Sequence, residues 1–253
     1  MICVAQNFEG YVVMQSATCP IELANSNTLL YVSPMSSFLP KLDVLPLAQR
    51  IVWAELVEIP QEFTLYGGTA IALHLGHRQS IDFDFFGWNA FAPLDLAASI
   101  AFLSGGAVLQ SEPNTLTMLI DRDGPVKISF FGVPRLKKIR RPHVASVNGL
   151  QIASLLDLAG TKVAVVQQRA EAKDYIDIDA VLMNGKIDLP MALAAAQLIY
   201  GSVFSPQNAL KALTYFDEPQ LQNLPDEIKH RLVKAVRSVD LDRLPKFEAA
   251  SET

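Results

Sequence analysis

Residues 65–86 read "LYGGTAIALHLGHRQSIDFDFF", and this stretch decides the fold. A short apolar run ends in Gly67-Gly68, a segment of helical character follows, and a second apolar run contains Asp82 and Asp84. Successive side chains of a strand point to opposite faces, so these two carboxylates share one face. Aspartate is disfavoured in strands, and two like charges on one face repel unless a cation lies between them. The pattern therefore predicts a metal ion bound by both carboxylates.

The glycine pair supplies the second part of the predicted site. Gly67 and Gly68 allow the backbone to approach a ligand closely, and Thr69 is the expected N-cap of a helix whose free N–H groups attract phosphate. Mg²⁺ is usually held by one or two carboxylates together with substrate phosphates. The stretch thus indicates a phosphate and Mg²⁺ site, with Mn²⁺ as an alternative ion. A solvated polar face on an edge strand is the other interpretation of Asp82 and Asp84.

Composition limits the function classes. The chain has 253 residues and a net charge of -5, which argues against general electrostatic binding to nucleic acid but not against a local basic patch. Mean hydropathy is +0.24, yet no run of about 18 uncharged apolar residues occurs, so no membrane-spanning helix and no membrane partner are expected. Cys3 and Cys19 have no CxxC spacing, and the N-terminus does not read as a signal peptide, so a reducing cytoplasm fits.

The order of the expected elements predicts an α/β (α+β) fold with a mixed sheet and a C-terminal helical part. Apolar spacing and turn residues indicate helices at 44–58, 69–77 and 93–103, strands at 63–68 and 80–88, three strands between 107 and 132, and helices at 153–185, 189–201, 205–216 and 224–241. On the strand at 80–88, Ile81, Phe83 and Phe85 are expected on the face opposite the aspartates. The break at "SVNG" divides an α/β domain, 37–147, from a helical domain, 148–253. Residues 1–36 have no sustained period and are set apart as an N-terminal extension.

The motif at 65–86 resembles the opening motif of the nucleotidyltransferase superfamily with the DNA polymerase beta fold. More closely, it is similar to the AbiEii/AbiGii toxin family of bacterial nucleotidyltransferases, in which a glycine pair, a short helix and a "GHR-S" stretch precede DxD. A second block, "LLDLAGTKVAVVQQRAEAKDYIDIDAVL", resembles the family's later block of lysine, arginine and K-D-x-x-D. The resemblance covers about residues 60–185. It implies that residues 37–147 are the nucleotidyltransferase domain.

The resemblance carries five further residues into the site, namely Lys162, Arg169, Lys173, Asp174 and Asp177. The three cations would share a helix face if the helix is continuous, and could hold a triphosphate opposite the metal. Asp174 could order Lys162 or Arg78, or act as a base toward an acceptor hydroxyl. A solvated charged face of an amphipathic helix is the alternative interpretation.

Two nearby residue types have different expected roles. Arg78, a cation beside the aspartates, is expected to bind phosphate or to hold the carboxylates ionised. His74 and His77 are expected at the surface or in packing rather than as ligands.

One position departs from the family pattern. Active enzymes of the superfamily usually add a third carboxylate from a neighbouring strand, and the matching strand here, "PVKISFFG", places Ser129 at that position. Three explanations stay open. The enzyme uses one metal with Asp174 in the missing role, the strand register differs from the expected one, or the fold binds nucleotide without transferring it.

A basic run follows that strand. "PRLKKIRRPH" at 134–143 contains Arg135, Lys137, Lys138, Arg140 and Arg141. In an acidic protein it is the obvious polyanion patch, and RNA is the natural candidate, although a solvated loop is the commoner meaning of such a run.

The resemblance implies a Mg²⁺-dependent nucleotidyltransferase that moves a nucleoside monophosphate from an NTP to a hydroxyl acceptor, with tRNA as a candidate. It also implies a toxin with an antitoxin partner. The alternatives are a catalytically impaired nucleotide-binding protein of the same fold and a protein whose apolar helical half binds a partner.

Overall fold

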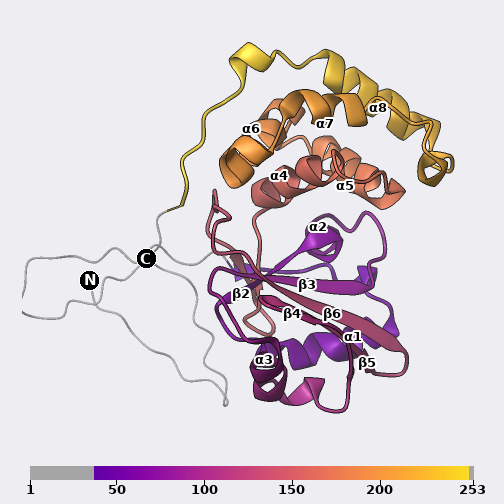
Figure 1. Ribbon diagram of the computed structural model, residues 1–253. Helices are drawn as coiled ribbons and strands as arrows, with labels where there is room; N and C mark the ends of the chain where they lie inside the picture. Colours follow the sequence, from indigo (N-terminus) through magenta and orange to yellow (C-terminus); the bar gives the residue numbers. More distant parts are fainter. Residues whose placement is uncertain (1–36, 251–253) are drawn as a thin grey trace, which may run out of the picture. The chain divides into compact units, whose positions relative to one another are not determined.

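The computed structural model describes residues 37–250 (Figure 1). Residues 37–250 belong to one unit by their internal contacts. The extension predicted at 1–36 lies outside the described residues.

The sheet is mixed, as the sequence predicts, and has eight strands in the order β1-β7-β8-β2-β3-β6-β5-β4. Their bounds are β1 Ser37–Phe38, β2 Phe63–Tyr66, β3 Asp82–Gly87, β4 Ala107–Glu112, β5 Thr115–Asp121, β6 Pro125–Gly132, β7 His143–Ala145 and β8 Gln151–Ile152. The meander of β4, β5 and β6 is confirmed, and its two turns place Asn114 and Asp123 at positive φ. The very short strands β1, β7 and β8 carry too few residues to give a periodic signal.

The helices are α1 Leu47–Glu55, α2 Gly67–Leu75, α3 Pro93–Ser99, α4 Leu155–Val165, α5 Ala172–Met183, α6 Leu189–Tyr200, α7 Pro206–Ala212 and α8 Asp226–Arg237. In Figure 1, α1 and α3 lie on one side of the sheet, and α2 lies on the other side beneath α4 and α5, with α6, α7 and α8 beyond them. The helical half thus stacks on the face of the sheet that carries α2.

Two expectations about helices are wrong. The stretch 153–185 is not one helix, because α4 ends at Val165 and α5 begins at Ala172, with an irregular turn between them. Ser154 starts α4 by accepting a hydrogen bond from the backbone N–H of Asp157, as an N-cap residue should. Thr69 is not the N-cap of α2, because the helix begins two residues earlier, at Gly67. Gly76 does end α2, with a φ of 71°.

The alternation on β3 is confirmed for the strand itself. Phe83 and Phe85 are fully buried, and Asp82, Asp84 and Phe86 point to the other face. Ile81, expected beside the two phenylalanines, precedes the strand and is exposed. Alternation therefore places both aspartates on the side of α2.

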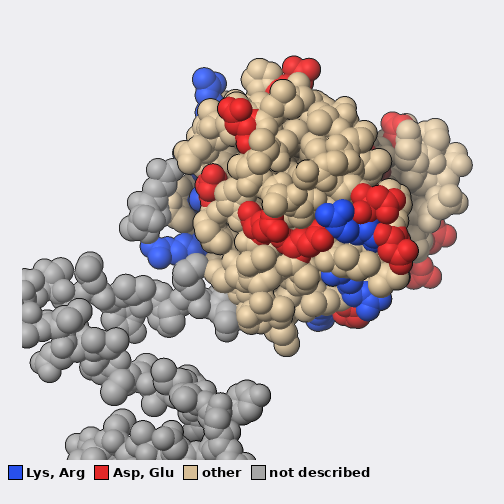
Figure 2. Space-filling view, turned by 90° about the horizontal axis from the view of Figure 1, so that it is seen from below, with Lys and Arg blue, Asp and Glu red and all other residues tan. Residues whose placement is uncertain are grey.

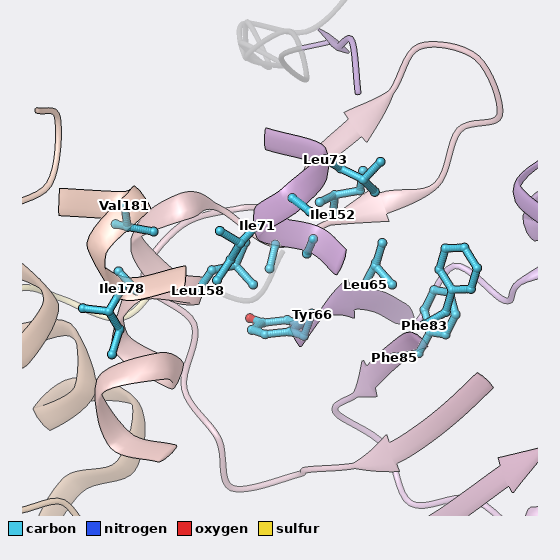
Figure 3. Close-up of a cluster of buried hydrophobic side chains, with 14 of the residues drawn as sticks. Leu65, Tyr66, Ile71, Leu73, Phe83, Phe85, Ile152, Leu158, Ile178 and Val181 are labelled. Atoms are coloured by element: carbon cyan, nitrogen blue, oxygen red, sulfur yellow. The ribbon is translucent and has the colours of Figure 1, made fainter. Parts of the chain in front are cut away.

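The hydrophobic core runs from the sheet through α2 into the helical half. Figure 3 shows Leu65, Phe83 and Phe85 of the sheet, Ile71 and Leu73 of α2, Leu158 of α4 and Ile178 and Val181 of α5. All of these side chains are almost completely excluded from solvent. Because each half buries apolar surface of the other, α2 is fixed between the sheet and the helices.

The domain boundary expected at residue 148 falls in the turn between β7 and β8. Since β8 pairs with β2, the sheet extends past this boundary to Ile152. The division into a sheet domain and a helical domain stays a prediction about independent folding.

The side of the sheet away from the helical half is largely uncharged at its surface. Figure 2, viewed from below, shows a mostly tan face whose acidic and basic side chains gather next to one another. An ion pair joins α1 to the turn before β6, where Arg122 Nε lies 2.9 Å from Glu55 Oε1. Because the basic side chains on this face lie next to acidic ones, the view shows no purely basic patch that would favour a polyanion.

Candidate active site

Asp82 and Asp84 lie on β3 next to a parallel strand, β6. The register pairs Asp82 with Lys127 and Asp84 with Ser129, which confirms the strand position expected for Ser129. Lys127 Nζ lies 3.2 Å from Asp82 Oδ2, and both side chains are partly exposed. The residues that face the aspartates from β6 are therefore a cation and a hydroxyl, and no third carboxylate stands there.

The first glycine of the pair leaves room for Asp84. Gly67 has a φ of 74°, and a Cβ atom at this position would lie 2.8 Å from Asp84 Oδ2. A side chain is thus excluded twice, by backbone conformation and by space.

The second glycine leaves room for Arg78. A Cβ atom on Gly68 would overlap Arg78 Nη2 and would lie 3.1 Å from Asp177 Oδ2. The sequence predicts that these glycines let a ligand approach the backbone. In the structure, the atoms that approach the two glycines are side chains of the site.

Thr69 turns its side chain away from the glycines. It is buried, its Oγ1 lies 2.7 Å from Ser80 Oγ, and it also donates a hydrogen bond to the backbone carbonyl of Asp82. The hydroxyl therefore ties α2 to the start of β3, and only the backbone N–H of Thr69 is left for the predicted phosphate contact.

Asp177 of α5 is contacted by side chains from two other parts of the chain, the segment after α2 and helix α4. It accepts hydrogen bonds from Arg78 Nε at 2.7 Å and Nη2 at 2.9 Å, and His77 Nε2 lies 2.7 Å from its Oδ1. Lys162 Nζ of α4 lies 2.8 Å from its Oδ2. Although the side chain is fully buried, these donors hold the pKa of Asp177 well below its usual range, against the effect of desolvation.

Asp174, one turn earlier on α5, also contacts Lys162 and binds Arg169. Lys162 Nζ donates to its Oδ1 at 2.6 Å, and Arg169 Nε donates to its Oδ2 at 3.0 Å. The side chains of Lys162 and Asp174 are almost completely buried, whereas that of Arg169 is 48% exposed. Lys162 is thus fixed between two carboxylates, and Arg169 can reach outward.

Lys173 does not join this cluster. Its Nζ pairs with Glu171 Oε2 at 3.0 Å, and both side chains are exposed. The expectation that Lys162, Arg169 and Lys173 share one helix face is wrong, because α4 and α5 are separate helices. Lys162 and Arg169 still meet, since the turn at 166–171 returns Arg169 to Asp174.

The acid pair and the cations belong to one electrostatic environment. Burial and the neighbouring Asp82 raise the pKa of Asp84, while Lys127, a hydrogen bond from Ser129, and Lys162 lower it. The Asp84 carboxylate in turn helps to raise the pKa of Arg169. Residues from β3, β6, α4 and the following turn therefore lie within reach of one another's charge.

The residues present fit a divalent cation at the acid pair. Asp82 and Asp84 offer carboxylate oxygens on one face, and the glycine conformation at Gly67 leaves Asp84 Oδ2 its space. These are the hard oxygen donors that Mg²⁺ and Mn²⁺ prefer. Between residues 37 and 250, no group of three or more His, Cys, Asp or Glu side chains could surround a metal ion. The donor set thus fits an ion that completes its shell with substrate or water.

The basic run forms the loop between β6 and β7. Arg135, Lys137, Arg140 and Arg141 are exposed. Lys138 Nζ lies 3.9 Å from the centroid of the Trp88 ring. Trp88 therefore places an aromatic ring beside the basic run, which contains no Phe, Trp or Tyr of its own.

The buried Asp157 of α4 anchors the loop. Its carboxylate accepts backbone hydrogen bonds from Ile139 at 2.8 Å and Arg140 at 3.1 Å. The loop is thus attached to the helix that carries Lys162.

A family model described as "Nucleotidyl transferase AbiEii toxin, Type IV TA system" matches residues 50–253. The chain belongs to this AbiEii family of nucleotidyltransferase toxins. An uncharacterized protein of Aquifex aeolicus strain VF5 is 31% identical to this AbiEii family member over 163 residues, which cover 63% of the chain and 76% of the relative.

Two solved structures share the fold of this AbiEii family member. A protein of H. pylori assigned as a nucleotidyltransferase superposes with a TM-score of 0.51 at 14% identity, covering 75% of this chain and 92% of that one. MenT4, a nucleotidyltransferase toxin of Mycobacterium tuberculosis H37Rv, gives a TM-score of 0.52 at 13% identity, with coverages of 77% and 83%. The predicted nucleotidyltransferase fold is therefore confirmed.

Sequence reasoning missed two residues of the site. His77 was expected at the surface or in packing, but it contacts Asp177; its place in the "GHR" segment beside Arg78 was the available signal. Lys127 precedes Ser129 by two positions on the same strand, so the alternation that places Ser129 near Asp84 also places Lys127 near Asp82.

Among the helices that the structure describes, none is by itself long and apolar enough to span a membrane. One pair bent by 119°, Leu189–Val203 with Pro206–Ala212, meets the length and composition criteria only when its two parts are counted together.

Proposed function

We propose that this protein transfers a nucleoside monophosphate from an NTP to a hydroxyl acceptor and releases pyrophosphate, as the toxin of a toxin-antitoxin pair. The observation that supports this most strongly is the arrangement around Gly67 and Gly68. On one side lies the partly exposed acid pair, and on the other lies a lysine held between two buried carboxylates.

Asp82 and Asp84 would hold a Mg²⁺ ion, with Mn²⁺ as the alternative. When bound, such an ion would polarise the α-phosphate and balance the charge of the leaving pyrophosphate. The backbone N–H groups of Gly67, Gly68 and Thr69 at the start of α2 are directed to the triphosphate, since the first N–H groups of a helix have no partner inside it.

Lys162 and Arg169 balance the charge of the phosphates. Lys162 loses little side-chain freedom on binding, because two salt bridges of 2.6 and 2.8 Å already fix its ammonium group. Arg169 keeps a hydrogen bond to Asp174 while nearly half of its side chain is open to solvent, so it can turn toward a ligand. Lys173 and Arg78 act farther from the phosphates, through Glu171 and Asp177.

Asp174 and Asp177 are positioning residues in this proposal. Both oxygens of Asp174 accept hydrogen bonds from Lys162 or Arg169, and its side chain is fully buried. Asp174 therefore orders the cations rather than serving as the base toward the acceptor. The acceptor oxygen bonds to the α-phosphorus, the bond from that phosphorus to the pyrophosphate oxygen breaks, and the hydroxyl proton passes to water.

The acceptor that the surface favours is RNA, with tRNA as the first candidate. The loop at 134–143 presents Arg135, Lys137, Arg140 and Arg141 to solvent and is anchored to α4 by Asp157. Such a loop would contact phosphates, and its contribution should fall as the salt concentration rises. An antitoxin partner and a cytoplasmic location complete the proposal.

Calorimetric titration of each NTP, with and without Mg²⁺, tests the nucleotide site. Asp82→Asn/Asp84→Asn should abolish the Mg²⁺-dependent heat, whereas Asp121→Asn/Asp123→Asn, a double change of equal charge in and beside the β5–β6 turn, should leave it intact. Loss in both double variants, or in neither, would contradict the assignment of the acid pair.

A transfer assay with α-labelled NTP and total tRNA tests the reaction. Lys162→Met should lower the rate by about 10²–10³-fold if its charge acts on the phosphates in the transition state. Label on RNA that depends on Asp82 would support the proposal, and nucleotide binding without any transfer would contradict it. The second result would favour the alternative of a nucleotide-binding protein without transferase activity.

A further inference from the structure

Lys127 occupies a position that the proposed reaction leaves unexplained. It lies on β6, directly opposite Asp82 in the parallel register, and Ser129 lies opposite Asp84. A carboxylate from this strand would give two metal ions a shared set of ligands, as two-metal sites require. At this strand the chain instead presents an ammonium group and a hydroxyl.

The ammonium group of Lys127 forms an ion pair with Asp82, one of the two acids of β3. Lys127 Nζ lies 3.2 Å from Asp82 Oδ2, with side-chain exposures of 41% and 30%. The other cations near the site have different partners, since Lys162 pairs with Asp174 and Asp177. Lys127 therefore places a positive charge beside Asp82 Oδ2, where a second divalent cation would meet repulsion instead of a ligand.

We propose that Lys127 takes the place of a second metal ion, so that the site binds one divalent cation per chain. This inference rests on the proposed nucleotide site. Asp82 would share its carboxylate between the cation and the ammonium group, and Asp84, which also accepts a hydrogen bond from Ser129, would be the second ligand. Lys127 then supplies the second positive charge beside the phosphates, from the side of β6, whereas Lys162 and Arg169 supply theirs from the helical half.

The test counts bound Mn²⁺ by the electron paramagnetic resonance signal of the free ion. The full chain is titrated in the presence of an NTP analogue with a methylene group between the α- and β-phosphates. After the Mn²⁺ held by unbound analogue is subtracted, the wild-type complex should contain one Mn²⁺ per chain. Lys127→Asp, which adds a carboxylate to β6 opposite Asp82, should contain two. Lys229→Asp is the matched control, because it makes the same charge change at a lysine of α8 that pairs with Asp226 at 3.2 Å, and it should bind one.

A second variant protects the test against a local folding defect. Lys127→Gln removes the ammonium group without adding a carboxylate, so it should still bind one Mn²⁺ but with about tenfold higher affinity, since a repelling charge is gone. Circular dichroism melting confirms that each variant is folded.

Four outcomes overturn the inference. They are two ions in the wild type, one ion in folded Lys127→Asp, two ions in Lys229→Asp, and an unchanged Mn²⁺ affinity in Lys127→Gln. The failure of the proposed function is a separate result, in which the wild-type chain binds neither the analogue nor Mn²⁺.

Discussion

The strongest stability prediction concerns Asp177→Asn. In the wild type the buried carboxylate accepts four close contacts, at 2.7 to 2.9 Å, from His77, Arg78 and Lys162. Asparagine has a similar volume but no charge, so the cations of Arg78 and Lys162 lose their anion. Removing one partner of a buried ion pair costs about 3–5 kcal/mol. For a chain of this size, about 2–4 °C of Tm is lost per kcal/mol, so Tm at pH 7 should fall by about 6–20 °C.

The matched control is Asp179→Asn, two residues along the same helix. Asp179 also binds an arginine through both oxygens, at 2.8 and 2.7 Å, but its partner Arg231 is 41% exposed. Solvent screens such a pair, so the loss should be about 1 kcal/mol or less, which is at most about 4 °C in Tm. Differential scanning calorimetry of both variants measures the difference, and equal losses of Tm would refute the reasoning from the three donors.

The same pair of variants gives a pH test. The pKa of Asp177 is depressed in the folded chain, so the ionised form is the stabilised one. Its contribution is therefore fully present above the unfolded value, near 3.9, and is lost as the pH falls below it toward the folded pKa. The Tm difference between the wild type and Asp177→Asn should be constant from pH 8 to 5 and should shrink below pH 4. A difference that shrinks already between pH 7 and 6 would contradict a depressed carboxyl pKa.

Three further predictions are independent of this network. Gly67→Ala and Gly185→Ala both replace a glycine at φ 74°, but only the first brings a Cβ atom to 2.8 Å from Asp84 Oδ2. By calorimetry, Gly185→Ala should lower the free energy of unfolding by about 1–2 kcal/mol. Gly67→Ala should lower it further and should also bind Mn²⁺ and nucleotide at least about tenfold more weakly. Burial lowers the pKa of His74 to about 4, so the folded state favours the neutral ring and stability falls as the pH drops from 6.5 toward 4; an NMR titration midpoint near 6.5 for this ring would refute it. Asp157→Asn removes the charge that accepts hydrogen bonds from two backbone N–H groups of the basic loop. Hydrogen exchange at both amides should become faster, and the free energy of unfolding should fall by about 1–3 kcal/mol. Unchanged amide exchange would contradict the anchoring role.

The sequence determined the parts of the site that depend on short-range spacing. Alternation on β3 correctly placed Asp82 and Asp84 on one face, and the same rule on β6 put Ser129 beside them. Both results follow from a period of two within one strand, which requires no knowledge of the remaining chain.

The contacts that depend on long-range packing could not be predicted in the same way. The spacing of Lys162 and Arg169 suggested one continuous helix face, but they meet because a turn between two helices folds back onto Asp174. Asp177 contacts residues about 100 positions earlier, and no local period encodes that separation. Thr69 looked like an N-cap because threonine favours that position, yet the tight glycine turn starts the helix two residues earlier.

The order of the site residues along the chain has a consequence for synthesis. The acid pair lies on β3, whereas Lys162, Asp174 and Asp177 lie on α4 and α5, about 90 residues later. At about 5–20 residues per second, a ribosome needs roughly 5–20 s to add that length. During this interval the growing chain can carry both carboxylates but not the lysine or the two acids that fix it. A chain interrupted before α4 therefore lacks half of the site, and the complete site exists only once α4 and α5 have been made.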